Sequence, residues 1–255
     1  MRTMRTRVLA AVSVVALLTT SCGSDDAPPA GDATLTVFAA ASLTAAFTEL
    51  GDAFTAENPD AEVTFNFAGS SDLVAQITEG APVDVFASAD LANMAKLIDA
   101  GLDGDDPVVF ATNLAEIIVE PGNPTGITGV ADLADGNLFV VQCAPEVPCG
   151  SYAEQIFANA GVEVTPASFE ENVKAVVTKV VLGEADAGIV YRTDVIAAGA
   201  DADGVTIGDD VNVVAEYPIV SIDDAPNPVG ARAFVEFVLS PAGQQILASY
   251  GFGSS

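Results

Sequence analysis

Three short stretches of this sequence place small or hydroxyl-bearing residues where an apolar run gives way to a helical pattern. They read VFAAASLTAAF at 37–47, FAGSSDL at 67–73 and VPCGSYA at 147–153. Backbone N–H groups at a helix start have no acceptor within the helix, and the helix dipole is positive there, so such a turn can hold an anion. For Ser42 or Ser70 alone, the ordinary alternative is a helix N-cap. Only convergence of the three turns would make a site.

Catalytic arrangements have much weaker support in the sequence. The chain contains no His, which excludes Ser-His-Asp and Cys-His nucleophiles. Asp84 and Asp90, in VDVFASAD, could pair for acid–base work, but their spacing does not distinguish them from solvated surface charges. A phosphate-binding loop with a lysine is also missing. We therefore expect a protein that is not an enzyme and that holds no cofactor and no metal.

The charge of the chain is strongly one-sided. Eight Lys and Arg stand against 36 Asp and Glu, a formal net charge of −28 in 255 residues. A chain this acidic does not attract nucleic acid or an anionic membrane surface through its general field. The acidity itself favours solubility in an exposed or salty setting.

The N-terminus predicts export. Three arginines in MRTMRTR precede the apolar run VLAAVSVVALL, which is too short to span a bilayer, and Cys22 follows closely. We predict a lipoprotein signal peptide over residues 1–21 and lipidation of Cys22, with a plain cleaved signal as the alternative. Residues 22–32, small, polar and Pro-containing, predict a flexible tether. Removal of 1–21 would take three arginines away and leave a net charge of 5 − 36 = −31.

Two further cysteines, Cys143 and Cys149, lie in QCAPEVPCG. Outside the cytoplasm such a pair usually forms a disulfide. The alternative is metal binding, but two thiols in a chain without His make a poor zinc site. Closure of so short a loop stabilises the fold by about 2 kcal/mol in the chain-entropy treatment, and it would also hold the backbone of the loop in one shape.

Short apolar runs and helical patterns alternate along the rest of the chain. Strand-like runs lie at 34–40, 62–69, 83–90, 114–120, 137–142, 187–191 and 212–220. Helical patterns follow several of them, including 151–160 and 170–183, and the chain ends in two helices separated by a restart at Ser240-Pro241. This alternation predicts parallel α/β sheets. In such sheets the carboxyl ends of the strands meet at one edge, which could bring the three turns together.

Four segments together have a more specific meaning. VFAAASLTAAF, FAGSSDLVAQITEGAPVDVFASAD, PEVPCGSYAEQ and EADAGIVYRTD resemble the successive signature segments of the periplasmic molybdate-binding proteins of ABC transporters. They occur in that family's order, and the similarity runs from about residue 33 to 253. The resemblance implies a type II periplasmic-binding-protein fold, with two α/β lobes that close on a tetrahedral oxyanion. Residues 33–112 and 219–255 would form lobe 1, and residues 113–218 would form lobe 2.

The same resemblance implies a set of ligand-binding residues. Ser42 and Ser70 would supply hydroxyl and amide donors, and Cys149 would donate its backbone N–H from a position that is commonly Ala in the family. Val173, in ENVKAVV, would donate an N–H from a helix start, and Tyr191, in GIVY, its phenolic O–H. From the residues alone, Val173 is better explained as helix core and Tyr191 as an aromatic residue at a strand end.

Together these observations predict an extracytoplasmic receptor, anchored to the cell membrane by lipid and monomeric. It would capture molybdate, and also tungstate, and pass the ion to a membrane ABC permease. Two alternatives remain: a receptor for another tetrahedral oxyanion such as sulfate, and a surface lipoprotein that binds no ligand.

Overall fold

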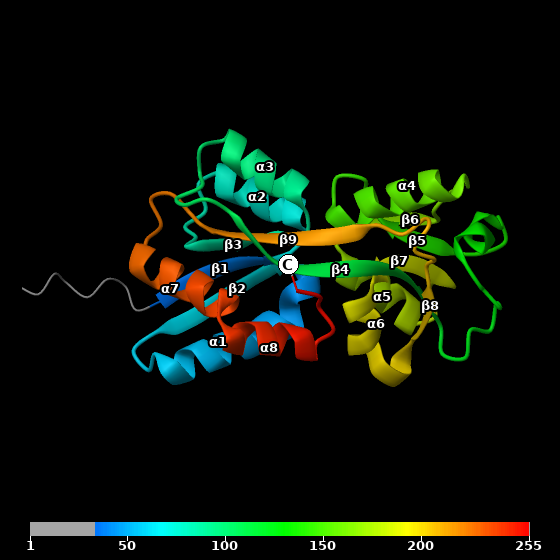
Figure 1. Cartoon of the computed structure of the whole chain (residues 1–255). Helices are drawn as coiled ribbons and strands as arrows, with labels where there is room; N and C mark the ends of the chain where they lie inside the picture. The colour runs from blue at the N-terminus through cyan, green and yellow to red at the C-terminus, as the bar shows by residue number, and fades with distance from the viewer. Residues whose placement is uncertain (1–33, 255) are drawn as a thin grey trace, which may run out of the picture. The chain divides into compact units, whose positions relative to one another are not determined.

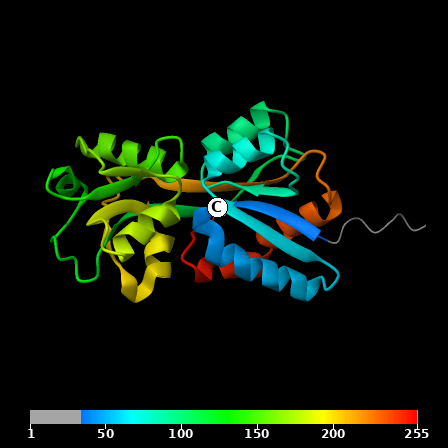
Figure 2. The same cartoon turned by 180° about the vertical axis from the view of Figure 1, so that it is seen from behind.

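The first lobe is built around β1, which lies between two parallel neighbours. The computed structural model describes residues 34–254, and here β1 (Thr34–Ala40) pairs with β2 (Glu62–Ala68) and β3 (Val85–Ala87). Helices α2 (Ser70–Thr78) and α3 (Leu91–Asp99) cover one face of this sheet. Helices α1 (Thr44–Glu57), α7 (Pro228–Leu239) and α8 (Pro241–Ser249) cover the other (Figures 1 and 2).

Aromatic rings fill the space between the first lobe's sheet and α1 and α7. Phe47 and Phe54 on α1 lie about two helical turns apart, on the same side of the helix. Both pack edge-on against Phe234 of α7, at centroid distances of 6.2 and 5.4 Å. Phe110 joins them from the strand β4 (Val108–Val119). Burial of these rings is the main stabilising contribution to this face, and it fixes α1 so that its N-terminal end points at the carboxyl end of β1.

The second lobe repeats the pattern. Strands β5 (Val140–Cys143), β6 (Ser168–Glu170) and β7 (Ala187–Tyr191) are parallel. Helix α4 (Pro148–Ala160) covers one face of the lobe's sheet, and α5 (Val173–Val181) and α6 (Arg192–Ala198) cover the other (Figure 1). A short strand, β8 (Asp203–Thr206), adds to its edge, and the 3-10 helices η2 (Val130–Ala134) and η3 (Gly199–Asp201) complete it.

Two long strands join the lobes. β4 (Val108–Val119) pairs with β9 (Val214–Ser221) through its first half and with β7 and β8 through its second half. β9 in turn pairs antiparallel with β3. The sheet order is therefore β2-β1-β3-β9-β4-β7-β5-β6, and the chain crosses between lobes along β4 and β9. The lobe boundaries proposed from the sequence, 112/113 and 218/219, fall inside these two strands and stay a proposal.

The predicted parallel sheets are present in each lobe, but β4, β8 and β9 run antiparallel to their neighbours. Alternating apolar runs do not specify strand direction, because direction depends on partners far away in the chain.

The restart of the helix at Ser240, predicted from the sequence, is confirmed. The Ser240 hydroxyl caps α8 by accepting from the Gly243 N–H, and Pro241 takes the first helical position.

The predicted signal peptide (1–21), the lipidated Cys22 and the tether (22–32) lie outside the described residues. Within residues 34–254, no helix combines the length and apolar character needed to cross a membrane.

Candidate functional site

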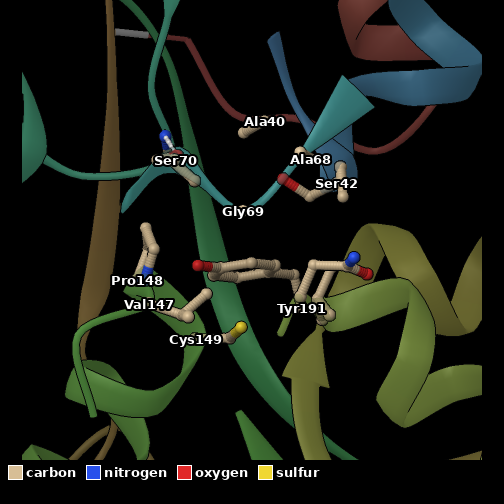
Figure 3. Close-up of a pocket in the computed structure, with 13 residues that line it drawn as sticks. Ala40, Ser42, Ala68, Gly69, Ser70, Val147, Pro148, Cys149 and Tyr191 are labelled. Atoms are coloured by element: carbon tan, nitrogen blue, oxygen red, sulfur yellow. Dashed lines mark hydrogen bonds between the residues drawn. The ribbon is translucent and has the colours of Figure 1, made fainter. Parts of the chain in front are cut away.

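A small cavity lies where the N-terminal ends of several helices from both lobes face one another. The space in it that a water-sized sphere can reach is about 10 Å³, far below the roughly 300–1,000 Å³ typical of sites for organic ligands. Thirteen residues line it (Figure 3). They are Ala40, Ala41, Ser42, Ala68, Gly69, Ser70, Ala89, Val147, Pro148, Cys149, Asn172, Val173 and Tyr191. The cavity suits a compact ion of a few atoms.

On the side of the first lobe, the cavity is lined by the turns after β1 and β2. Ser42 lies in the short 3-10 helix η1 (Ala41–Leu43) that leads into α1, and Ser70 is the first residue of α2. Neither serine is an N-cap, because the cap positions are Ala40 and Gly69 and neither has a side-chain capping bond. The ordinary explanation for these two serines is therefore wrong.

Both serine hydroxyls are hydrogen-bonded to groups of the protein: Ser70 to a backbone N–H and Ser42 to a tyrosine hydroxyl. Ser70 Oγ accepts from the backbone N–H of Ala89 at 3.1 Å. Ser42 Oγ lies 3.0 Å from the hydroxyl of Tyr217, a fully buried residue of β9. A backbone N–H can only donate, so the proton of Ser70 remains free for an acceptor in the cavity.

On the side of the second lobe, the starts of α4 and α5 line the cavity. Cys149 and Val173 lie in the first turns of these helices, where backbone N–H groups have no acceptor within the helix. Asn172 caps α5 by accepting from the Ala175 N–H at 3.1 Å. The side chains of Cys149 and Val173 are buried in the apolar core, so each residue has a structural role besides the free amide.

The disulfide predicted from QCAPEVPCG is present. It joins Cys143, at the end of β5, to Cys149, with a Cα–Cα distance of 5.6 Å. Gly150 tightens the same loop, because a Cβ there would clash with the carbonyl oxygen of Ala144. The backbone that carries the Cys149 amide is thus held on both sides, by a covalent bond and by a close backbone contact.

Tyr191 extends from the end of β7 across the cavity, with its hydroxyl directed between Ser70 and Pro148 (Figure 3). The residue is 2% exposed, and its hydroxyl has no hydrogen-bond partner. Within the described residues, only Ser71 Oγ shares that condition. Burial raises the pKa of Tyr191 well above its ordinary value, and the nearby Tyr217 and Tyr152 act in the same direction. The phenol therefore keeps its proton and is available as a donor.

The backbone of Tyr191 is fixed by Asp194. Its carboxylate accepts from the Tyr191 N–H at 3.1 Å and from Lys174 Nζ at 2.8 Å. Burial raises the pKa of Asp194, although the Lys174 cation opposes that shift. This ion pair neutralises the lysine that follows Val173. None of the residues that line the cavity is charged.

Gly69 brings the two lobes into close contact beside the cavity. A Cβ at this position would lie 2.5 Å from the carbonyl oxygen of Glu171, in the second lobe. Its φ of −59° is accessible to any residue. The glycine is therefore needed for the close approach of the lobes and not for a special backbone conformation.

All five residues predicted from the sequence, Ser42, Ser70, Cys149, Val173 and Tyr191, line this one cavity. That they bind an oxyanion stays a prediction. Sequence reasoning missed Asn172, Ala89 and Tyr217. The cap residue Asn172 had a local signal, since Asn directly precedes the helical run, whereas Ala89 and Tyr217 had none.

Asp84 and Asp90 are buried rather than solvated. Asp84 accepts from the backbone N–H groups of Thr36 and Asn227 and so ties β1 to the start of α7. Asp90 caps α3 by accepting from the Asn93 N–H. Each carboxylate is engaged in its own structural hydrogen bonds, so the two do not form an acid–base pair.

Comparison with known proteins gives concordant results. Residues 35–253 match the family described as bacterial extracellular solute-binding protein. The molybdate-binding protein ModA of Mycobacterium tuberculosis is 42% identical over 97% of this chain and 96% of its own length.

Two solved structures share the fold. The periplasmic molybdate-binding protein of Azotobacter vinelandii superposes with a TM-score of 0.74 at 20% identity, covering 87% of this chain and 99% of its own. The sulfate-binding protein SubI of M. tuberculosis gives 0.75 at 19% identity, covering 86% of each chain. These likenesses confirm the two-lobed α/β fold. They do not distinguish the two ions, because both structures match equally well.

Proposed function

Since the chain belongs to the family of bacterial extracellular solute-binding proteins, we propose that it is the receptor of an ABC importer and captures molybdate in the cavity between its lobes. The identity to ModA over nearly the whole chain supports the choice of ion. Its relatives bind solutes, and we propose that this protein performs no chemical reaction.

One observation carries the proposal: the uncharged cavity offers hydrogen-bond donors from both lobes and leaves the hydroxyl of Tyr191 without a partner. A buried polar group without a partner costs about 1–3 kcal/mol, and an oxyanion would relieve that cost. Hydrogen bonds to a charged acceptor are about twice as strong as neutral ones. Hydroxyls, amides and helix starts can therefore replace the hydration of a dianion without a cation in the wall.

The donors also suggest how other anions are rejected. Hydrogen phosphate carries a proton that needs an acceptor, and a buried mismatch of that kind costs about 1–3 kcal/mol. Sulfate has no such proton but is smaller, so fixed donors on two lobes cannot all reach it. Tungstate shares the size and charge of molybdate, and we propose that it binds as well.

Lobe closure is part of the proposal. The close contact at Gly69 supports a closed arrangement of the lobes, and hinge motion along β4 and β9 would admit the ion. Lipidation at Cys22, the monomeric state and transfer to a membrane permease complete the proposed role. Sulfate remains the second candidate ligand, because SubI has the same fold.

Thermal unfolding of the exported domain with an oxyanion panel tests this function. Molybdate and tungstate at 100 times their dissociation constant should stabilise the protein by about 2.7 kcal/mol, whereas equimolar sulfate and phosphate should not. Equal shifts with sulfate and molybdate would replace the proposal with a general oxyanion receptor. No shift with any oxyanion would favour a surface lipoprotein without a ligand.

A further inference from the structure

Ser42 is hydrogen-bonded to a residue of β9, one of the two strands that join the lobes. Its Oγ lies 3.0 Å from the Tyr217 hydroxyl, which belongs to β9 and does not line the cavity. Ser42 and Tyr217 are buried and 175 residues apart in sequence. Tyr217 sits opposite Ala111 in the β4–β9 pairing, so Asn113, two residues further on, lies on the same face of the sheet.

The Asn113 side chain on that face is engaged with other partners: its Oδ1 accepts from the backbone N–H of Leu114 at 3.0 Å, and its Nδ2 donates to Thr193 Oγ1 at 2.9 Å. In the described part of the chain, the hydrogen-bond partner of the buried Tyr217 hydroxyl is Ser42 Oγ. Burial raises the pKa of Tyr217, so the phenol keeps its proton, and a buried proton needs an acceptor.

The direction of each remaining bond follows from the proton count. Tyr217 has one hydroxyl proton, and Ser42 Oγ is the acceptor within hydrogen-bond distance, so that proton goes to Ser42 Oγ and is not left unpaired in the core. Ser42 then accepts behind the wall, and its own proton points into the cavity. Ser70 reaches the same state by accepting from the Ala89 amide. A backbone N–H thus orients the hydroxyl of Ser70, whereas a tyrosine side chain orients the hydroxyl of Ser42.

We propose that Tyr217 is a positioning residue that holds the Ser42 hydroxyl as a donor to the bound ion, and that it thereby determines selectivity against protonated oxyanions. The inference rests on the proposed function, since it concerns the same cavity. Without Tyr217 the Ser42 hydroxyl can rotate and accept. Hydrogen phosphate could then place its proton on Ser42, while sulfate, which has none, would gain nothing.

The test compares hydrogen phosphate with sulfate, because both are dianions of similar size that differ by one proton. Displacement of molybdate by each ion at pH 8.5 is measured for the wild type and for Tyr217→Phe, which keeps the ring in the core. We expect molybdate affinity to fall about 3- to 10-fold, the effect of one hydrogen bond. We also expect the ratio of hydrogen phosphate to sulfate affinity to rise at least about threefold. A packing defect would weaken both competitors equally.

Tyr250→Phe is the matched control, because it removes an exposed phenol that donates to Glu49 at 2.7 Å. It should leave both affinities unchanged.

The outcomes separate the two claims. A wild type that binds molybdate, together with an unchanged ratio in Tyr217→Phe, overturns this inference and leaves the proposed function standing. A wild type that binds no oxyanion removes both. A raised ratio in Tyr217→Phe but not in Tyr250→Phe supports the positioning role.

Discussion

The substitution Tyr191→Phe separates a binding role from a structural one, because the two roles predict opposite effects on the ligand-free protein. The Tyr191 hydroxyl is buried and has no protein partner. Removal of its oxygen therefore breaks no hydrogen bond within the protein. The melting temperature of the ligand-free variant should stay the same or rise.

Molybdate binding should weaken, because the phenol is expected to donate to the ion. A hydrogen bond to a charged group contributes about 1.5–3 kcal/mol, which corresponds to a loss of about 10- to 150-fold in affinity. At a molybdate concentration of 100 times the wild-type dissociation constant, the stabilisation should fall from about 2.7 kcal/mol to between about 1.4 and 0.3 kcal/mol. For a domain of this size, about 2–4 °C per kcal/mol applies, so a shift of about 5–11 °C should shrink to about 1–6 °C.

Calorimetric titration and thermal unfolding with and without molybdate measure both effects. Tyr152→Phe is the control, because its ring packs edge-on against Tyr191 at 6.4 Å but does not line the cavity. Unchanged affinity in Tyr191→Phe would refute the reasoning. A melting temperature several degrees lower without ligand would also refute it, since it would give the hydroxyl a structural role.

Four further outcomes are expected. Gly69→Ala should leave the ligand-free melting temperature unchanged but weaken molybdate binding at least about tenfold, because the new Cβ would meet the Glu171 carbonyl oxygen when the lobes close; calorimetry with normal affinity would contradict the closure. Non-reducing peptide mapping should find Cys143 joined to Cys149, and replacement of both by Ala should destabilise the domain by about 2 kcal/mol; free alkylation of both thiols would be inconsistent with the bond. Affinity should stay constant or rise slightly with sodium chloride, since neutral dipoles hold the ion and the general repulsion is screened within about 8 Å. It should also stay flat between about pH 6 and 8.5, because burial raises the pKa of Tyr191 and the phenol keeps its proton throughout. A steep fall with salt would indicate binding by a lysine or an arginine.

Much of the secondary structure and the disulfide could be predicted from the chain itself. Helical spacing on α1, the restart at Ser240-Pro241 and the short interval between Cys143 and Cys149 are local features, and local geometry determines them. The site was predicted in two ways. Turn chemistry indicated the stretches around Ser42, Ser70 and Cys149, whereas Val173 and Tyr191 were identified only through resemblance to a family. From their own surroundings in the sequence, Val173 would have been assigned to the helix core and Tyr191 to the end of a strand.

The sequence by itself determined which turns could present donors: helix starts, small side chains and hydroxyls are local properties, and the lack of His removed the nucleophile–base alternatives. Only the tertiary structure decided that these turns meet, that Asp84 and Asp90 are buried, and that β4 and β9 run antiparallel across the lobes. It also placed Tyr217 behind Ser42 from 175 residues away. The physical reason is that burial, strand direction and the direction of a hydrogen bond depend on which partner arrives from elsewhere in the chain. The spacing of neighbouring residues does not contain that information.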